Sequence, residues 1–259
     1  MTQEGLRARF LVSFAGRAAS LFSLLAVWQA AAWLAHSRLF PGAGAVLATL
    51  VEDATHGDLL HHLGATLARV AVAFALAMTI GTTVGIAMGR SRAIDTLLDS
   101  GVVLLLNLPA LVIAVLLYVW LGLTEAAAIG AVTLSKLPAV VVTMREGART
   151  LDRDLADMAK SFQFGGWRTF RHVVLPQLAP FFLVASRTGL ALIWKIVLVV
   201  ELLGRPDGIG YAIQVFFQLF DVRRLIAYAL AFVAVMLAIE ILLVQPFERR
   251  ASRWRVQPA

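Results

Sequence analysis

The stretch DMAKSFQFGGWRTFRHVVLP, from Asp157 to Pro176, is a polar, basic segment between long apolar runs. It contains two short helical patterns, which Gly165-Gly166 separates and Leu175-Pro176 closes. An ordered polar segment of this kind is unusual between apolar runs of membrane-spanning length. It indicates a membrane protein with an organised loop that contacts a partner.

The composition is that of a membrane protein. The chain has 259 residues, of which 60% are apolar and 15% charged, whereas soluble domains carry about 25% charged residues. We therefore predict an all-α polytopic membrane protein in which residues 1–259 form a single membrane domain. The absence of cysteine excludes thiolate metal sites and cysteine nucleophiles. The net charge of +7 is better explained by membrane-flanking loops than by nucleic-acid binding.

Six segments are long and apolar enough to cross a bilayer as helices of ~20 residues. They are residues 12–35, 63–89, 98–121, 124–145, 177–203 and 224–246. The first could instead be a signal peptide, whose apolar core is roughly 7–15 residues long. The run from Ala18 to Ala35 is longer than that, which favours a retained first transmembrane helix.

Lysine and arginine are distributed asymmetrically between the loops. With a cytoplasmic N-terminus, the inner regions hold Arg7, Arg9, Arg17, Arg90, Arg92, Arg145, Arg149, Arg153, Lys160, Arg168, Arg171, Arg249, Arg250, Arg253 and Arg255. The outer regions hold only Arg38, Arg205, Arg223 and Arg224. The positive-inside rule therefore predicts that both termini and the loop around Asp157 to Pro176 are cytoplasmic.

Small residues and prolines mark features inside the spans. Gly81, Gly85 and Gly89 recur every four residues, which favours close packing against another helix over incidental glycines. Pro109 and Pro138 each remove a backbone donor at membrane depth. Such interruptions are tolerated where protein or a water-filled cavity covers them, so these helices are expected to line a pathway.

The polar loop has the pattern of a short amphipathic helix. Thr150 is a candidate N-cap for a helix starting near Leu151. Its apolar face would consist of Leu155, Met158, Ala159 and Phe162. Gly165-Gly166 is expected to break this helix before a second amphipathic stretch that lies along the membrane interface. Physical reasoning leaves two possibilities open, a helix that a partner grips or a merely interfacial loop.

The same loop resembles the cytoplasmic loop of ABC-importer permease subunits. That family carries Glu-Ala-Ala, three residues, Gly, nine residues, Ile, one residue and Leu-Pro. This chain places Asp157, Met158 and Ala159 at the first three positions, Gln163 at the Gly, Val173 at the Ile, and Leu175-Pro176 at the end. Met158 and Gln163 depart from the pattern. Glutamine disfavours the left-handed conformation that glycine allows, so Gly165-Gly166 is the alternative source of the turn.

Further blocks over residues 40–245 are similar to the family. Phe40-Pro41 and the run Thr66–Val70 resemble the family in general. The run Ala191–Glu201, followed by Gly208-Ile209-Gly210-Tyr211, resembles its nitrate, sulfonate and taurine branch. The resemblance implies a type I ABC importer fold with six transmembrane helices and a second permease copy. A homodimer is usual for this branch, and a heterodimer is the alternative. The resemblance also implies an extracytoplasmic solute-binding protein, location in the bacterial inner membrane and a small anionic solute.

Two ATPase subunits would each grip one coupling helix, about Leu151–Phe164, within the loop 151–173. The implied coupling residues are Leu155, Asp157, Met158, Ala159, Phe162, Gln163, Gly165 and Gly166. A phosphate-binding loop needs Gly-Lys-Ser/Thr, and none of the three lysines, Lys136, Lys160 and Lys195, follows a glycine. ATP and Mg are therefore expected to bind the partner ATPase, with no cofactor in this chain and no enzymatic activity of its own.

Several ionisable groups fall within the predicted spans, where charge is costly and often functional. Arg187 and Lys195 could share a face of the fifth helix and attract an anion; alternatively, Arg187 reaches the inner interface and Glu201 the outer one. The pathway candidates are Pro109, Arg187, Trp194, Lys195 and Glu201. Arg69 and Lys136 are interpreted as packing or pairing residues.

Other functional classes have little support. His61 and His62 are adjacent, and no carboxylate pattern completes a metal site with them. No Ser/His/Asp arrangement suggests a membrane enzyme. The alternative that stays open is a stand-alone secondary transporter or channel, which an internal inverted repeat would favour.

Overall fold

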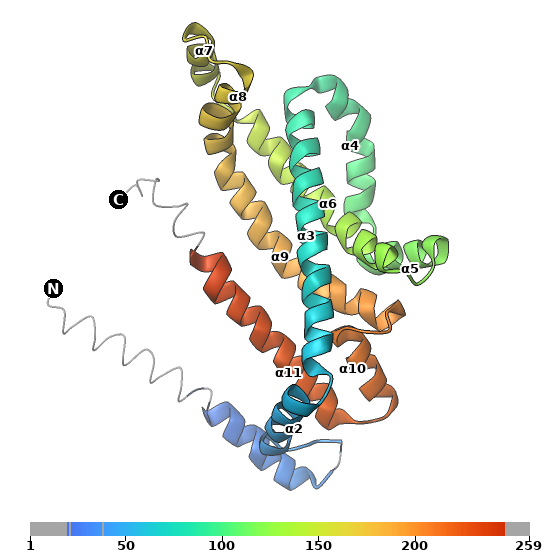
Figure 1. Ribbon diagram of the computed structural model, residues 1–259. Coiled ribbons are helices and arrows are strands. Elements are labelled where there is room, and N and C mark those ends of the chain that lie inside the picture. The colour runs from blue at the N-terminus through green and yellow to red at the C-terminus, as the bar shows by residue number, and fades with distance from the viewer. Residues whose placement is uncertain (1–19, 21, 38, 247–259) are drawn as a thin grey trace, which may run out of the picture. The chain divides into compact units, whose positions relative to one another are not determined.

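The computed structural model describes residues 20, 22–37 and 39–246, and every regular element among them is helical. Figure 1 shows these elements. The chain divides into two compact units, Met1–Leu60 with Ile213–Ala231, and His61–Ala212 with Phe232–Ala259. Each unit is considered by itself over its described residues.

Among the residues that the structure describes, four helices are long and apolar enough to cross a membrane. They are α3 (Leu59–Arg90), α6 (Glu125–Arg149), a continuous helical run over Gly166–Gly204, and Val222–Leu242, which begins as α11 (Val222–Ile239). These helices correspond to four of the six predicted spans. The predicted first span, 12–35, falls partly outside the described residues, which hold an apolar helix over Phe22–Ala35.

The predicted span 98–121 is broken. It consists of α4 (Arg92–Asn107) and α5 (Ala110–Leu121), which are bent by 102° relative to each other. Pro109 lies at the corner as the N-cap of α5, with extended backbone at ψ 135°. Because proline has no N–H to donate, the α4 ladder ends before it. Pro138, in contrast, lies inside an uninterrupted α6.

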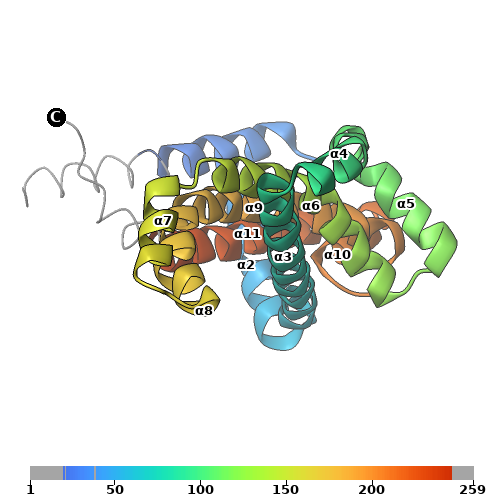
Figure 2. The same ribbon diagram turned by 90° about the horizontal axis from the view of Figure 1, so that it is seen from above.

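The predicted packing of the three glycines is confirmed, because all three face α6. A Cβ on Gly81 would lie 2.7 Å from Val140 Cβ, and one on Gly85 would lie 2.6 Å from Val141 O. A Cβ on Gly89 would lie 2.6 Å from Ala148 Cβ. These contacts bring the backbones of α3 and α6 close together where the two helices run past each other (Figure 2).

The core of the second unit lies between α3, α6 and α9 (Leu175–Gly204). It contains the buried side chains Met78, Val140, Met144, Leu178 and Ala185. Ion pairs join α4 to one end of α6, since Arg145 Nη1 lies 2.5 Å from Asp99 Oδ1 and 3.3 Å from Asp95 Oδ1. The apolar core therefore packs α3, α6 and α9 together, and the ion pairs attach α4 to α6.

The first unit contains α2 (Ala43–His56) with parts of α10 (Ile209–Gln218) and α11. Arg224 Nε lies 3.3 Å from the carboxylate of Asp53 on α2. The Phe216 and Tyr228 rings meet edge to face at 4.9 Å between centroids. A polar and an aromatic contact therefore fix the start of α11 within this unit.

Candidate functional site

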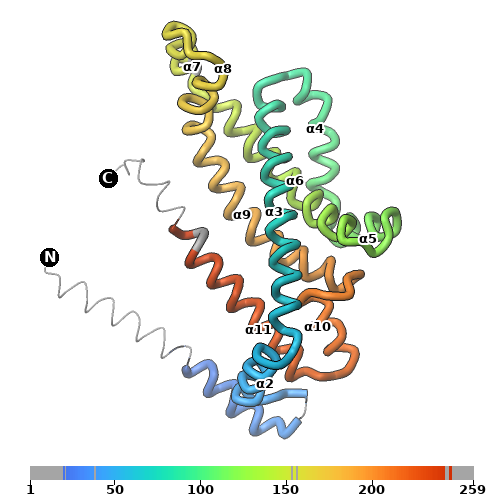
Figure 3. Tube along the Cα trace, in the orientation of Figure 1, coloured from blue at the N-terminus to red at the C-terminus, as the bar shows by residue number. Residues whose placement is uncertain are grey.

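The polar loop forms α7 (Arg153–Ser161) and α8 (Gly166–Thr169) between α6 and α9, as the chain trace in Figure 3 shows. Asp152 is the N-cap of α7, and its Oδ1 accepts from Asp154 N at 2.8 Å. The prediction that Thr150 caps this helix was wrong. Thr150 instead ends α6, where its hydroxyl donates to Gly147 O at 2.9 Å. Helix α6 extends further than predicted, so the cap shifts by two residues.

The turn after α7 is made by Gln163 itself. Gln163 has φ +53°, and its N–H donates to Lys160 O at 2.9 Å while Phe164 N–H donates to Ala159 O at 2.8 Å. These two bonds form a Schellman motif, which requires a left-handed residue at the position of Gln163. The alternative that Gly165-Gly166 supplies the turn was wrong, because Gly165 has φ −63° and is the N-cap of α8.

Helix α7 presents apolar side chains to its surroundings. Phe162 is 71% exposed, and Leu155 and Met158 are exposed as well. Ala159 is only 1% exposed, so it packs inside the loop instead of on the outer face. Asp157 forms an ion pair with Lys160 at 2.8 Å. Exposed apolar groups beside a charged pair are typical of a surface that a partner covers.

The second amphipathic stretch, which was expected to lie along the membrane interface, is continuous with the next long helix. Helix α8 runs through a π-helical turn, Phe170–Val174, directly into α9. Leu175 N–H donates to Phe170 O in the π register, and Pro176 lies in the first turn of α9. Leu175-Pro176 therefore does not close the segment. Pro176 has no backbone N–H to donate. The π-helical turn before it changes the hydrogen-bond register, so the helix continues past the proline.

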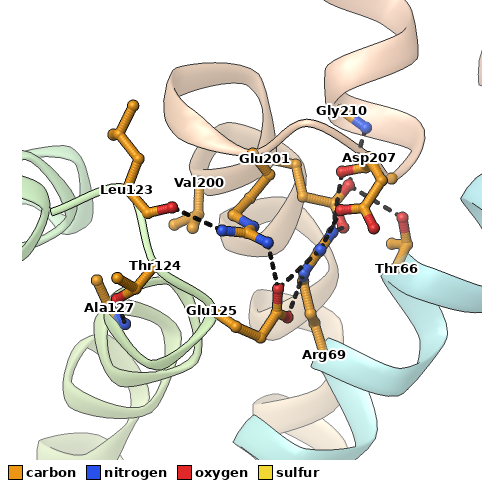
Figure 4. A network of polar contacts seen from close by, with 12 residues as sticks. Thr66, Arg69, Leu123, Thr124, Glu125, Ala127, Val200, Glu201, Asp207 and Gly210 are labelled. Atoms are coloured by element: carbon orange, nitrogen blue, oxygen red, sulfur yellow. Dashed lines mark hydrogen bonds and ion pairs between the residues drawn. The ribbon is translucent and has the colours of Figure 1, made fainter.

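An ion cluster around the buried side chains of Arg69 and Glu201 joins the other ends of α3, α6 and α9. Figure 4 shows Arg69 of α3 among three carboxylates. Its guanidinium lies 2.8 Å from Glu201 Oε1 and 2.7 Å from Glu125 Oε1, and it also donates to Asp207. Arg205 binds Glu125 from the opposite side at 2.7 Å. We call these five residues the clamp. It confirms the interpretation of Arg69 as a pairing residue.

The clamp also holds the first turn of α10. Ile209 N–H donates to Thr66 Oγ1 at 2.8 Å, and Gly210 N–H donates to Glu201 Oε2 at 2.9 Å. Gly208 has φ +103°, and a Cβ there would lie 2.3 Å from Glu201 Cδ. The Gly-Ile-Gly sequence is thus required by the close approach of the backbone to the carboxylate.

The clamp contains three carboxylates and two guanidinium groups. Burial by itself raises the pKa of the Asp207 carboxyl, but the hydrogen bond and charge of Arg69, together with the charge of Arg205, outweigh it. The pKa of Asp207 therefore lies below its ordinary value of 3.8.

Sequence reasoning missed Glu125 and Asp207 as members of the clamp. Nothing in the residues around them identifies a partner more than fifty positions away.

The pathway candidates separate into two groups. Arg187, Lys195 and Pro109 are exposed on the subunit. Trp194 is buried and meets Phe232 edge to face at 5.6 Å, and the buried Glu201 has its partners in the clamp. Within the described residues, only the first group is placed to face something outside the subunit.

Lys136 lies in the helix core, as a packing residue. It is buried in α6 and points at Gly189 of α9, where a Cβ would lie 2.8 Å from Lys136 Cε. The glycine therefore makes room for the lysine side chain.

Comparisons with known proteins agree with this architecture. Residues 77–252 match the family model described as "Binding-protein-dependent transport system inner membrane component". The putative aliphatic sulfonates transport permease protein SsuC of Escherichia coli (strain K12) is 31% identical over 73% of this chain and 72% of its own length. SsuC of Bacillus subtilis (strain 168) is 27% identical over 90% and 84%. The taurine transport system permease protein TauC of Escherichia coli (strain K12) is 28% identical over 78% and 72%.

Two solved structures share the fold. The MetNI methionine ABC transporter, in inward facing conformations, superposes with a TM-score of 0.63 at 18% identity, over 75% of this chain and 96% of that one. An amino acid ABC transporter with histidines superposes with a TM-score of 0.60 at 20% identity, over 74% and 93%.

Proposed function

This chain belongs to the family of binding-protein-dependent transport system inner membrane components, and on that premise we propose that it forms the passage for a small anion. It is the permease subunit of an ABC importer, and the relatives do not support a stand-alone secondary transporter or channel. The solute is a sulfonate, taurine, nitrate or a similar anion that an extracytoplasmic binding protein delivers.

The observation that carries the anion proposal is the pair of exposed cations on α9. Arg187 and Lys195 lie eight positions apart, which is about 12 Å along the helix axis and about 80° around it. A cation inside a bilayer is costly unless it faces water or a counter-charge. Lys195 is proposed to line the passage on this ground, with Arg187 of the same helix beside it and Pro109 at the rim. Two permease copies would provide four such cations.

Coupling to ATP hydrolysis is proposed to occur at α7. The exposed side chains of Leu155, Met158 and Phe162 would fill a groove of the ATPase, one ATPase subunit per permease copy. Gln163 would set the direction of the turn that presents them. ATP and Mg bind the ATPase subunits, so hydrolysis takes place outside this chain.

The assembly is proposed to be a homodimer of permeases in the inner membrane, with both termini and α7 in the cytoplasm. Closure of the two ATPases would carry α7 with it and move the long helices as rigid bodies, alternating access to the passage. The clamp supports this proposal because it binds α3, α6, α9 and α10 together at the opposite ends of the spans.

The test is transport by the complete complex in proteoliposomes, with radiolabelled taurine and ethanesulfonate as probes. First, an ATPase should co-purify at one copy per permease. Then Lys195→Gln and Arg187→Gln should raise the KM for the transported anion by about tenfold each, because one charge contact is lost. Arg223→Gln, which changes an exposed arginine in the first turn of α11, is the matched control. Unchanged KM values in both α9 variants would contradict the anion passage.

A further inference from the structure

A cleft of about 570 Å³ opens in the second unit, beside residues 150–174 between α6 and α9, which we call the coupling segment. One wall is the corner between α3 and α4, with Met88, Arg90 and Arg92. The other wall is the base of the coupling segment, with Leu151, Thr169 and Val174. Its volume is within the ~300–1,000 Å³ range of ligand clefts. No part of the transport function described above uses it.

The cleft has excess positive charge. Its carboxylates are already engaged, since Asp95 binds Arg149 at 2.5 Å and Arg145 at 3.3 Å. The Asp152 carboxylate caps α7. Arg90 and Arg92 are exposed, and among the described residues neither has an ion pair or side-chain hydrogen bond. The charged residues that line the cleft are three arginines and two aspartates, so its lining has a net charge of +1, and within the part of the chain that the structure describes Arg90 and Arg92 have no ion-pair partner.

The position and lining of the cleft indicate an amphipathic ligand. It lies where α3 ends at Arg90 and α6 ends at Arg149, at the level where spanning helices leave the bilayer. Its inner wall is apolar, with the buried side chains of Met88, Val173 and Val174, and its mouth is basic. Basic pockets between helices at the cytoplasmic surface bind anionic lipid headgroups, and guanidinium groups match phosphate geometry.

We propose that Arg90 and Arg92 bind the phosphate of an anionic phospholipid headgroup in this cleft. The inference rests on the cytoplasmic orientation proposed above, because that leaflet carries the anionic lipids used as probes below. The single-residue corner at Ser91 between α3 and α4 keeps both arginines at the cleft.

A lipid in this position would connect the corner to the coupling segment. Gln177 ties the two ends of that segment together, because its Oε1 accepts from Asp152 N–H and its Nε2 donates to Val173 O, both at 2.9 Å. A headgroup wedged against this tie would transmit movement of α7 to α3. Anionic lipid is therefore expected to change the ATPase activity that is coupled to transport.

The experiment measures phosphatidylglycerol retained on the full permease–ATPase complex by native mass spectrometry. It is paired with ATPase activity in nanodiscs of phosphatidylcholine with and without phosphatidylglycerol. Arg90→Gln with Arg92→Gln should lower lipid affinity about 30-fold, and each single change roughly fivefold. Arg168→Gln with Arg171→Gln removes the same charge from exposed positions outside the cleft and should leave retention unchanged.

Equal lipid retention by the cleft pair and the control pair overturns the proposal. Stabilisation of the delipidated complex by millimolar inorganic phosphate, lost in the cleft pair, would reassign the cleft to free phosphate. Loss of the ATPase from the cleft pair would reassign the arginines to protein docking. Failure of any ATPase to co-purify with the unaltered chain would count against the proposed function alone, because lipid retention can then still be measured on the permease without an ATPase.

Discussion

Arg69 of α3 and Glu201 of α9 form a buried ion pair although they are 132 positions apart in the sequence. Arg69 Nη1 lies 2.8 Å from Glu201 Oε1, and the two side chains are 4% and 0% exposed. The remaining donors and acceptors are engaged by Glu125, Asp207 and Gly210. A fully satisfied pair of this kind tolerates burial, whereas a single partner left alone does not.

Arg69→Met should therefore destabilise the permease by about 3–5 kcal/mol, because it leaves the Glu201 carboxylate buried without its cation. Loss of folded protein after heating in detergent, followed by size-exclusion chromatography, measures the effect. Glu201→Gln in the same chain should restore part of the stability, since both charges are then gone. Arg223→Met is the control, and equal losses in Arg69→Met and Arg223→Met would rule out the clamp as a stabilising element.

The Asp207 carboxyl should make the stability of the permease depend on pH in the acid range. Its pKa in the folded protein lies below the ordinary value of 3.8, because the interactions with Arg69 outweigh the effect of burial. A depressed folded pKa contributes stability above the unfolded pKa, and that contribution is lost as the pH falls through the folded value. Asp207→Asn should thus lower the melting temperature at pH 7, and the gap to the unaltered chain should narrow at pH ~3. A gap that is independent of pH would contradict the assignment.

Gly85→Ala should loosen the contact between α3 and α6. The new methyl group would lie 2.6 Å from Val141 O, which is backbone and has little freedom to move. We expect a loss of about 1–3 kcal/mol by overpacking, measured as the thermal stability of the purified permease. Gly64→Ala in the same helix is the control, because no atom lies within 4 Å of its added methyl. It should be neutral or stabilising, and a similar loss in both variants would indicate a general effect of helix composition.

Gln163→Gly should stabilise the turn after α7. A non-glycine residue at φ +53° carries a left-handed penalty of about 1 kcal/mol, which glycine relieves. Slower hydrogen exchange at the amides of Gln163 and Phe164 would measure the gain. Gly165→Ala should change little, because its φ is −63° and no atom lies within 4 Å of the added methyl. Faster exchange in Gln163→Gly would show that the glutamine side chain has a role of its own.

Phe162→Asp should weaken binding of the ATPase by at least tenfold while leaving the permease folded, because the ring is 71% exposed. Ala159→Asp should instead disturb α7 itself, since Ala159 is buried in the loop. The ratio of ATPase to permease after affinity purification separates binding from folding. Phe217→Asp, an exposed phenylalanine in α10, is the control. Retention of the ATPase by the Phe162→Asp variant would contradict the proposal that the ATPase docks on α7.

Local patterns predicted well those features that depend on neighbouring residues. The apolar runs located α3, α6, α9 and α11, and the four-residue spacing of glycines identified the face of α3 that packs against α6. Competition between similar local signals was harder to predict. Thr150 and Asp152 are both good caps, and the C-terminal extension of α6 decided between them. The turn was mispredicted because the Schellman bonds of Gln163 offset its left-handed penalty.

The sequence by itself determined that this chain is a helical membrane protein, where four of its spans lie, and which polar loop carries the family pattern, because hydropathy and short motifs are properties of consecutive residues. Only the tertiary structure decided which charges are partners. The spacing of Glu201 along α9 sets the face on which its carboxylate lies, and Arg69 becomes its partner because α3 and α9 pack against each other. The same packing sets the carboxylate of Glu201 in the clamp and leaves Arg187 and Lys195 of the same helix exposed.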